Sequence, residues 1–232
     1  MPSVDHNAEV TLVVLVYRSL KWLDFVMDGV ERSSNETRYR WLVVANDATE
    51  EVRSDPRVTI DWRNENPGEF YINRVYRAWN EGVRQALTPL VCMMNSDMYP
   101  SDYWLDQLVW VKRNHVNVVP TSLLVESGRI QSAMPEYVRD FGRDPESFRR
   151  KEFLDHAEDV KKPGMVENGR LYMPILVNRQ EFFDMGAYPE GNPPGTTGDK
   201  DLFRRYADEG FRHVTALGSV CYHVQCGEQN WP

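Results

Sequence analysis

Short apolar segments alternate with stretches of helical spacing in the first half of the chain, and this alternation constrains the fold more than any other sequence feature. Apolar residues recur at helical spacing in residues 19–30, 71–87 and 102–111. The apolar segments between and around them predict strands at Val10–Tyr17, Trp41–Ala45, Val58–Trp62, Leu90–Met94 and Val116–Val119. Near-continuous apolar strands that alternate with helices predict an α/β fold, with a mostly parallel sheet and helices on both of its faces.

The second half of the chain is less regular. Glu126–Arg143 is polar and broken by Gly and Pro, and Asp144-Pro145-Glu146 has the form of a helix start, which predicts a helix to Lys162. Gly191–Gly198 has the composition of a loop. The remaining expected elements are strands at Leu171–Val177, His213–Leu217 and Ser219–Val224 and helices at Arg179–Met185 and Asp199–Glu209. No repeat or linker interrupts the chain, so we expect a single domain over residues 1–232.

Composition and charge narrow the classes of function. The 232 residues carry a formal net charge of -8, which argues against a general polyanion binder but leaves a nucleic acid open as a specific partner. No apolar run is long enough to span a bilayer, and no basic segment precedes an apolar core at the start. Three cysteines form no even disulfide framework, and Cys221, His223 and Cys226 lack a fourth ligand for structural zinc. We therefore expect a cytoplasmic protein with no integral membrane segment.

Acidic residues follow two of the expected strands. Asn46-Asp47 ends the second strand, and Asn95-Ser96-Asp97 follows the fourth. In open α/β sheets, ligands bind outside the carboxyl ends of the strands, so these carboxylates are the first indication of a binding site. Asp199 and His223 have ordinary explanations when each is taken alone. The first stands at the start of an expected helix, as a helix cap does, and the second lies in an apolar strand, as a core histidine does.

Two groups of residues follow one another in an order that resembles a known family. The first group is Asn80-Glu81-Gly82, the strand Leu90–Met94, the turn Asn95-Ser96-Asp97, and then Pro100 and Trp104-Leu105. The second group is Met173–Arg179, Met185–Tyr188, Gly198-Asp199-Lys200-Asp201-Leu202 with Arg205, and His223. Together they resemble the family-2 glycosyltransferases, which have the Rossmann-like glycosyltransferase A fold. The resemblance runs from about Val10 to His223.

The resemblance implies a divalent metal ion, Mn²⁺ or Mg²⁺, held by Asp97 and His223. Such ions accept carboxylate and phosphate oxygens and stabilise the negative charge that develops on a leaving diphosphate. The turn residues Asn95 and Ser96 are expected to contact the nucleotide sugar. The family often carries Asp at the place of Asn95, so this residue acts at most as a neutral ligand or hydrogen-bond donor.

The second group implies a general base and an acceptor side. Asp199 matches the base that takes the proton from the acceptor hydroxyl. Gly198 stands where the family carries Glu, and this departure bears on how the acceptor is positioned. Gly198 and Asp201 are therefore expected on the acceptor side.

Further residues are expected to contact the donor. Asn46-Asp47-Ala48-Thr49 resembles a weakened form of the family's nucleoside-binding motif, which makes Asp47 a candidate. Arg74 and Asn80 could reach the donor, and Tyr17 could contact the base or simply cover the edge of the sheet. Residues 1–125 are then the nucleotide-sugar-binding half, and residues 126–232 are the acceptor-binding half.

The expected function is inverting, metal-dependent transfer of a sugar from a nucleoside-diphosphate sugar, expected to be UDP-linked, to an acceptor hydroxyl. One alternative is a non-catalytic nucleotide-sugar-binding protein, favoured by Gly198 and by the neutral Asn95. The other is a nucleotidyltransferase, which needs a Gly-rich basic segment after the first strand, and residues 17–21 contain no glycine. The acceptor stays open between a saccharide, a lipid-linked glycan, a protein side chain and a modified nucleic-acid base.

Overall fold

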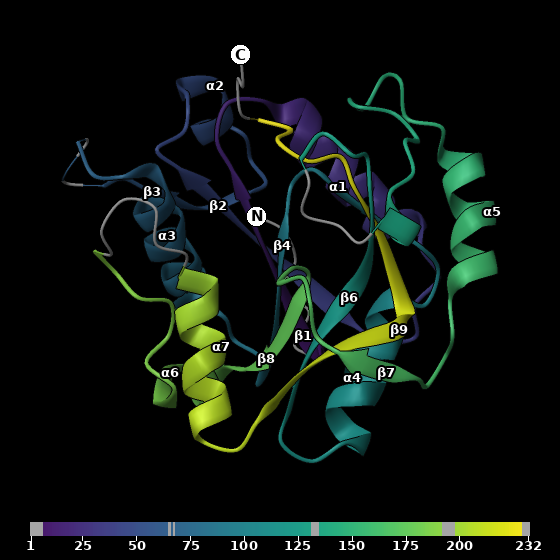
Figure 1. Ribbon diagram of the computed structural model, residues 1–232. Helices are drawn as coiled ribbons and strands as arrows, with labels where there is room; N and C mark the ends of the chain where they lie inside the picture. The colour runs from purple at the N-terminus through teal and green to yellow at the C-terminus, as the bar shows by residue number, and fades with distance from the viewer. Residues whose placement is uncertain (1–6, 65, 67, 131–134, 192–197, 229–232) are drawn as a thin grey trace.

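A single sheet forms the centre of the molecule (Figure 1). The computed structural model describes residues 7–64, 66, 68–130, 135–191 and 198–228. Within these ranges the sheet contains nine strands. They are β1 (Val10–Val16), β2 (Tyr39–Asn46), β3 (Val58–Trp62), β4 (Leu90–Asn95), β5 (Met98–Pro100), β6 (Val118–Glu126), β7 (Val166–Asn168), β8 (Ile175–Asn178) and β9 (Arg212–His223).

The sheet is mostly parallel, which confirms the expected fold class. Its order is β3-β2-β1-β4-β8-β6-β9-β5, and β7 pairs with β9. Strands β1, β2, β3, β4, β6 and β9 run in one direction, and β5, β7 and β8 run in the other. Because β8 lies antiparallel between β4 and β6, it joins the strands of the first half to those of the second in one sheet.

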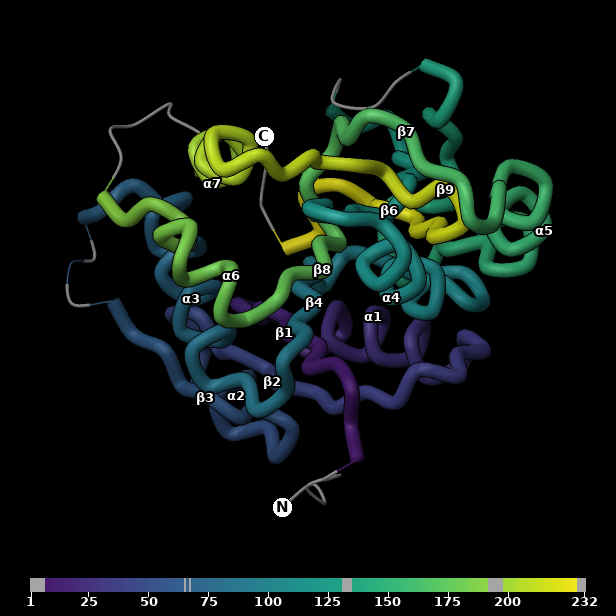
Figure 2. Tube along the Cα trace, turned by 90° about the horizontal axis from the view of Figure 1, so that it is seen from below, coloured from purple at the N-terminus to yellow at the C-terminus, as the bar shows by residue number. Residues whose placement is uncertain are grey.

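Helices cover both faces of the sheet, as the sequence predicts. They are α1 (Leu20–Arg32), α2 (Glu50–Arg53), α3 (Tyr71–Gln85), α4 (Trp104–Asn114), α5 (Arg150–Val160), α6 (Arg179–Asp184) and α7 (Gly198–Asp208), with a 3₁₀ turn η1 (Pro135–Tyr137). Figure 2 shows α1 and α4 on one face and α3, α6 and α7 on the other. In the described part of the chain, no helix has both the length and the apolar character needed to cross a membrane.

A second, aromatic core holds the irregular segment of the second half against the sheet. It contains Trp22 and Phe25 of α1, Tyr99 of β5, Phe153 of α5 and Tyr222 of β9, among others. The Tyr222 hydroxyl accepts a hydrogen bond from the backbone N–H of residue 141 and donates one to the carbonyl of residue 142. This buried hydroxyl fixes the loop that precedes α5.

Several expected elements differ from the structure in their bounds, and two differences have a clear local cause. The helix predicted to start at Asp144 begins at Arg150, because the Asp144 carboxylate accepts the N–H of Ser147 and forms a local turn instead. The two strands predicted at the C-terminal end are one strand, β9. Its register against β6 jumps between Ala216 and Val220, so the residues between them bulge rather than end the strand.

Close packing of α3 on β1 yields a test of the fold. A Cβ atom added at Gly82 would overlap the Val13 side chain. Gly→Ala inside a helix is ordinarily stabilising by about 0.5–1 kcal/mol. Here we expect Gly82→Ala to lower the free energy of unfolding by about 1–3 kcal/mol, measured by urea denaturation, because the overlap must be relieved.

The matched control is Gly68→Ala. Its added Cβ would lie 3.5 Å from Asn66 Oδ1, an ordinary contact, so we expect little change in stability. A Gly82→Ala protein more stable than the wild type would contradict the packing of α3 on β1.

Candidate functional site

Asp97, Glu126 and His223 meet where three strands of the sheet end. Asp97 follows β4, Glu126 ends β6 and His223 ends β9. His223 Nδ1 lies 2.8 Å from Glu126 Oε1, and His223 Nε2 lies 3.5 Å from Asp97 Oδ1. Only 7% of Asp97 and 1% of Glu126 are exposed. Burial lowers the pKa of His223, but the Asp97 charge and hydrogen bonds to both carboxylates raise it more, to about 10.

This donor set fits a divalent metal ion. A buried carboxylate is costly unless a positive group or hydrogen bonds balance it, so the place beside Asp97 favours a cation. Glu126 holds one nitrogen of His223 and leaves the other directed at Asp97, the arrangement that orients metal-binding histidines. One carboxylate and one imidazole suit Mn²⁺ and leave positions for phosphate oxygens. Among the described residues, no three His, Cys, Asp or Glu side chains form a metal site by themselves.

The side chain of Glu228 binds the backbone that follows β1. Its Oε2 accepts hydrogen bonds from the N–H groups of Tyr17 (2.7 Å) and Arg18 (3.3 Å), and its Oε1 accepts one from Ser19 (3.3 Å). Burial raises the pKa of Glu228 to about 7, although these N–H groups oppose the rise. Ser19, the N-cap residue of α1, makes no side-chain cap hydrogen bond. The carboxylate of Glu228 therefore binds the backbone of the connection between β1 and α1, just ahead of the first helical residue, Leu20.

Asp47 and Arg74 form a second group. Asp47 follows β2 with a positive φ of 48°, and its Oδ2 lies 3.2 Å from Arg74 Nε of α3. The same carboxylate accepts hydrogen bonds from the backbone N–H (2.9 Å) and the side-chain amide (2.6 Å) of Asn64. The structure thus brings two of the expected donor-binding residues together beside the carboxyl end of β2.

Asp199 lies in the first turn of α7, beside α3. The hydroxyl of Tyr76 donates a hydrogen bond to Asp199 Oδ2 at 3.0 Å. Burial raises the pKa of Asp199 to about 6, against the lowering effect of the hydrogen bond from Tyr76. A carboxylate with such a pKa is ionised at neutral pH and is a better proton acceptor than an ordinary aspartate.

Of the remaining predicted residues, Asn80 supports a neighbouring segment of the backbone. Asn80 is buried, and its side chain bonds the backbone N–H and carbonyl of Tyr188 and the carboxylate of Glu190. It holds the segment before α7, so we do not carry it forward as a donor contact. Asn95 and Ser96 lie next to Asp97 as expected, Asn95 partly exposed and Ser96 buried. The loop predicted at Gly191–Gly198 falls mostly on residues 192–197, outside the described residues.

Backbone contacts make these groups neighbours. The N–H of Gly227 donates to Asp97 Oδ2 at 3.0 Å, while the next residue, Glu228, binds the backbone of Tyr17. The Tyr17 carbonyl in turn accepts the N–H of Thr49, which follows Asp47 by two residues. The carboxyl ends of β1, β2, β4, β6 and β9 therefore contribute to one region of the molecule.

Three functional candidates were not identified from the sequence. Glu126 carried the same signal as Asp47 and Asp97, an acidic residue at the end of an apolar strand, but the predicted strand ended at Val119, before that residue. Tyr76 sits at a helical position indistinguishable from core packing. Glu228 lies beyond the last strand, where no local pattern indicates a contact with residues 17–19.

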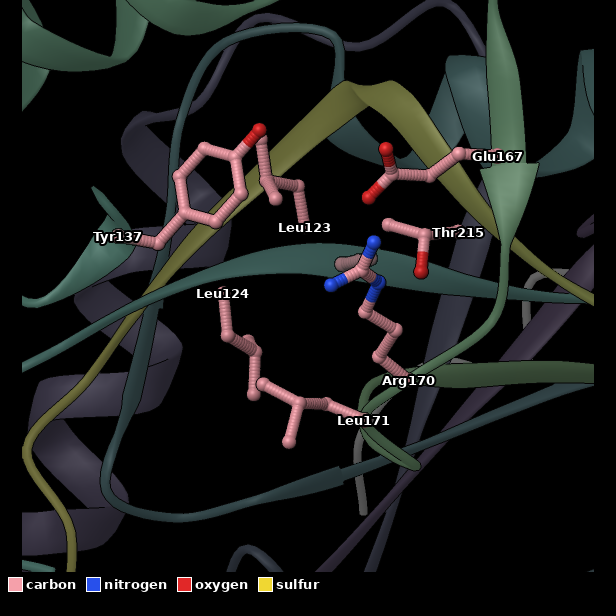
Figure 3. A pocket seen from close by; sticks show the side chains of 8 residues that line it. Leu123, Leu124, Tyr137, Glu167, Arg170, Leu171 and Thr215 are labelled. Atoms are coloured by element: carbon pink, nitrogen blue, oxygen red, sulfur yellow. The ribbon is translucent and has the colours of Figure 1, made fainter. Parts of the chain in front are cut away.

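A small pocket of about 30 Å³ lies on the second half of the sheet, near β6, β7 and β9 (Figure 3). The guanidinium of Arg170 points toward Glu167 and Thr215, with the Tyr137 ring across the pocket from them (Figure 3). This volume accommodates about one water molecule rather than a sugar. The pocket contains none of the predicted site residues, so we do not assign it to the candidate site.

Comparison with known proteins shows the fold. No protein-family model and no curated protein matches this sequence. Solved structures do match: GalNAc-T7 with UDP, GalNAc and Mn²⁺ has a TM-score of 0.67 at 12% identity, covering 94% of this chain and 44% of that chain. S. aureus TarS 1-349 has a TM-score of 0.57 at 13% identity, covering 93% and 60%. Both are glycosyltransferases of the A fold. The chain has that fold, as predicted, and spans less than two thirds of either structure.

The contact of Glu228 with the backbone of residues 17–19 can be tested by hydrogen exchange. Hydrogen bonds to charged groups contribute about 1.5–3 kcal/mol. We expect Glu228→Ala to increase amide exchange at residues 17–19 about ten-fold or more, since these N–H groups lose their acceptor. Asp106→Ala is the matched control, because its carboxylate accepts the N–H groups of Glu36 and Thr37 instead. Unchanged exchange at residues 17–19 in Glu228→Ala would contradict the contact.

Proposed function

We propose that this protein is an inverting, metal-dependent glycosyltransferase that moves a sugar from a UDP-linked donor to an acceptor hydroxyl. The observation that carries the proposal is the approach of Asp97 and His223, at the ends of β4 and β9, in a glycosyltransferase A fold. A structure with the same fold contains UDP, GalNAc and Mn²⁺. This supports a nucleotide-sugar donor and a divalent ion for the present chain.

Asp97 and His223 would hold the metal ion, with Glu126 orienting the imidazole. When bound, the ion supplies positive charge that stabilises the departing diphosphate. Asp47 and Arg74 lie beside the end of β2 and are assigned to the nucleoside. Tyr17, Asn95 and Ser96 complete the donor side in this proposal.

Asp199 is assigned the role of general base. The acceptor oxygen forms a bond to the anomeric carbon while the bond from that carbon to the diphosphate breaks, which inverts the configuration. The proton of the acceptor hydroxyl passes to the Asp199 carboxylate, so charge and atoms balance. Gly198 and Asp201, on the same turn of α7, are assigned to the acceptor side, together with residues of the 126–232 half.

The base assignment predicts a large loss of activity in Asp199→Asn. An amide cannot accept the proton, so we expect kcat to fall by at least about 100-fold while UDP binding stays within about two-fold. Wild-type kcat should fall as the pH drops through about 6, because protonation of Asp199 removes the base. Asp208→Asn, on the exposed last turn of α7, is the matched control and should behave as wild type.

The outcome separates the candidate functions. Near-normal transfer by Asp199→Asn would refute the base assignment. Binding of UDP without turnover by the wild-type protein, with every acceptor class offered, would favour the non-catalytic nucleotide-sugar-binding alternative.

The metal assignment predicts a Mn²⁺-dependent gain in thermal stability with UDP. A ligand at about a hundred times its Kd stabilises by about 2.7 kcal/mol, which raises the Tm of a chain of this size by several degrees. We expect Asp97→Ala to abolish this gain. Loss of a carboxylate that hydrogen-bonds a metal-binding histidine typically lowers metal affinity about 10–100-fold. Glu126→Ala should therefore need about 10–100-fold more Mn²⁺ to reach the same stability gain.

Glu167→Gln, which alters a carboxylate of the Figure 3 pocket, is the matched control and should respond as wild type. A stability gain with UDP that is the same with and without Mn²⁺ would contradict the metal assignment.

A further inference from the structure

The absence of a side chain at residue 198 has a specific structural partner. A Cβ atom added to Gly198 would lie 2.5 Å from Cε2 of the Tyr76 ring, closer than real Cβ atoms approach a neighbour. The ring of Tyr76 thus fills the space that any side chain at 198 would enter. Gly198 stands where the family carries Glu. The Tyr76 ring of α3 fills the space that a side chain at this position would need, so the glycine and the tyrosine go together.

The Tyr76 hydroxyl has only one direction in which to donate its proton. Its oxygen accepts the backbone N–H groups of Gly198 (2.9 Å) and Asp199 (3.3 Å), the first N–H groups of α7. A phenol has a single proton, and the acceptor in reach is Asp199 Oδ2 at 3.0 Å. Tyr76 therefore anchors the start of α7 and binds the carboxylate of the same turn.

Packing fixes the ring that carries this hydroxyl. Tyr76 is only 4% exposed, and its ring stacks on that of Tyr188 with centroids 4.9 Å apart and planes 14° apart. Asn80, one turn along α3, bonds the backbone of Tyr188 on both its N–H and its carbonyl. Because two positions of α3 hold the same segment, the hydroxyl has little freedom to move relative to the helix.

Within the described residues, three tyrosines from other segments face Asp199. They come from three elements: Tyr76 from α3, Tyr188 from the segment before α7, and Tyr172 from the segment before β8. Burial, and then the charge of Asp199, raise the pKa of each of them. These phenols stay neutral near pH 7 and can only donate to the carboxylate. Burial raises the pKa of Asp199, and the Tyr76 hydrogen bond opposes this rise.

We propose that Tyr76 is a positioning residue for the base: it takes the space of a side chain at 198 and directs the Asp199 carboxylate toward the acceptor hydroxyl. This inference rests on the proposed function, since it assumes that Asp199 is the base. It assigns to a helix of the donor half, α3, a role in the chemistry of the acceptor half.

Tyr76→Phe tests the hydroxyl with the ring retained. We expect kcat to fall about 10–100-fold, the range expected when a hydrogen bond to a charged group is lost, with KM for the donor within about two-fold. The pH at which kcat is half-maximal should rise above the wild-type value of about 6, because the carboxylate loses a donor that favours its ionised form. Tyr99→Phe is the matched control, because its hydroxyl donates to the Asp28 carboxylate at 3.1 Å, outside the site.

The outcomes separate the inference from the proposed function. If Asp199→Asn is inactive while Tyr76→Phe keeps the wild-type kcat and pH profile, the inference alone is overturned. If Asp199→Asn is as active as wild type, the proposed base fails, and the inference fails with it. A lowered Tm in Tyr76→Phe with an unmoved pH profile would reduce Tyr76 to a structural residue and also overturn the inference.

Two packing variants test the contribution of the Tyr76 ring separately from that of its hydroxyl. We expect Gly198→Ala to be less stable than wild type, because its Cβ meets the Tyr76 ring. Tyr76→Ala combined with Gly198→Ala removes that overlap, so the double variant should lose less stability than the two single losses added together. Its kcat should stay as low as that of Tyr76→Phe. Recovery of wild-type kcat in the double variant would show that the hydroxyl is not needed.

Discussion

Backbone pairing of β5 with β9 fixes the candidate site. Met98 lies opposite His223 in this antiparallel ladder, and the N–H of Val224 donates to the carbonyl of Asp97 at 3.0 Å. On its other side, β9 pairs in parallel with β6, which sets Glu126 opposite His223. The three side chains therefore come together through ladders of main-chain hydrogen bonds. Such a site is built on two strand ends and the short turn between β4 and β5, which favours a constant geometry of the three side chains.

Helix α3 contacts two other candidate residues, Asp47 and Asp199, and packs against the central sheet. It packs on β1 at Gly82, meets Asp47 through Arg74, and meets Asp199 through Tyr76. Residues 74 and 76 are two apart on a helix, so their side chains leave it in different directions. One helix thereby contacts a residue assigned to the nucleoside and the residue assigned as base. The distance between the two is determined by a single rigid element.

The strand ends at which the candidate site lies could be predicted because their signals are local. A buried strand needs a continuous apolar run, and the carboxylates that follow such runs at Asp47 and Asp97 are visible in the sequence. The helix start expected at Asp144 was wrong for a related reason. A side chain that can cap a helix can equally close a turn; here the Asp144 carboxylate closes a turn to Ser147, and Phe148, which follows, packs against the aromatic core. Glu228 and Tyr76 gave no local signal, because each acts on residues distant in the chain.

The sequence by itself determined the α/β class, the mostly parallel direction of the apolar strands, and the strand ends at which polar residues gather, since burial and backbone hydrogen bonding impose these patterns residue by residue. Only the tertiary structure decided which of those polar residues meet. His223 is paired with Glu126 as well as Asp97, Asn80 supports a loop, and Gly198 makes room for a tyrosine of another helix. The physical reason is that a local pattern specifies how a segment is buried, whereas the partner of a buried polar group depends on which segments the sheet and its helices bring side by side.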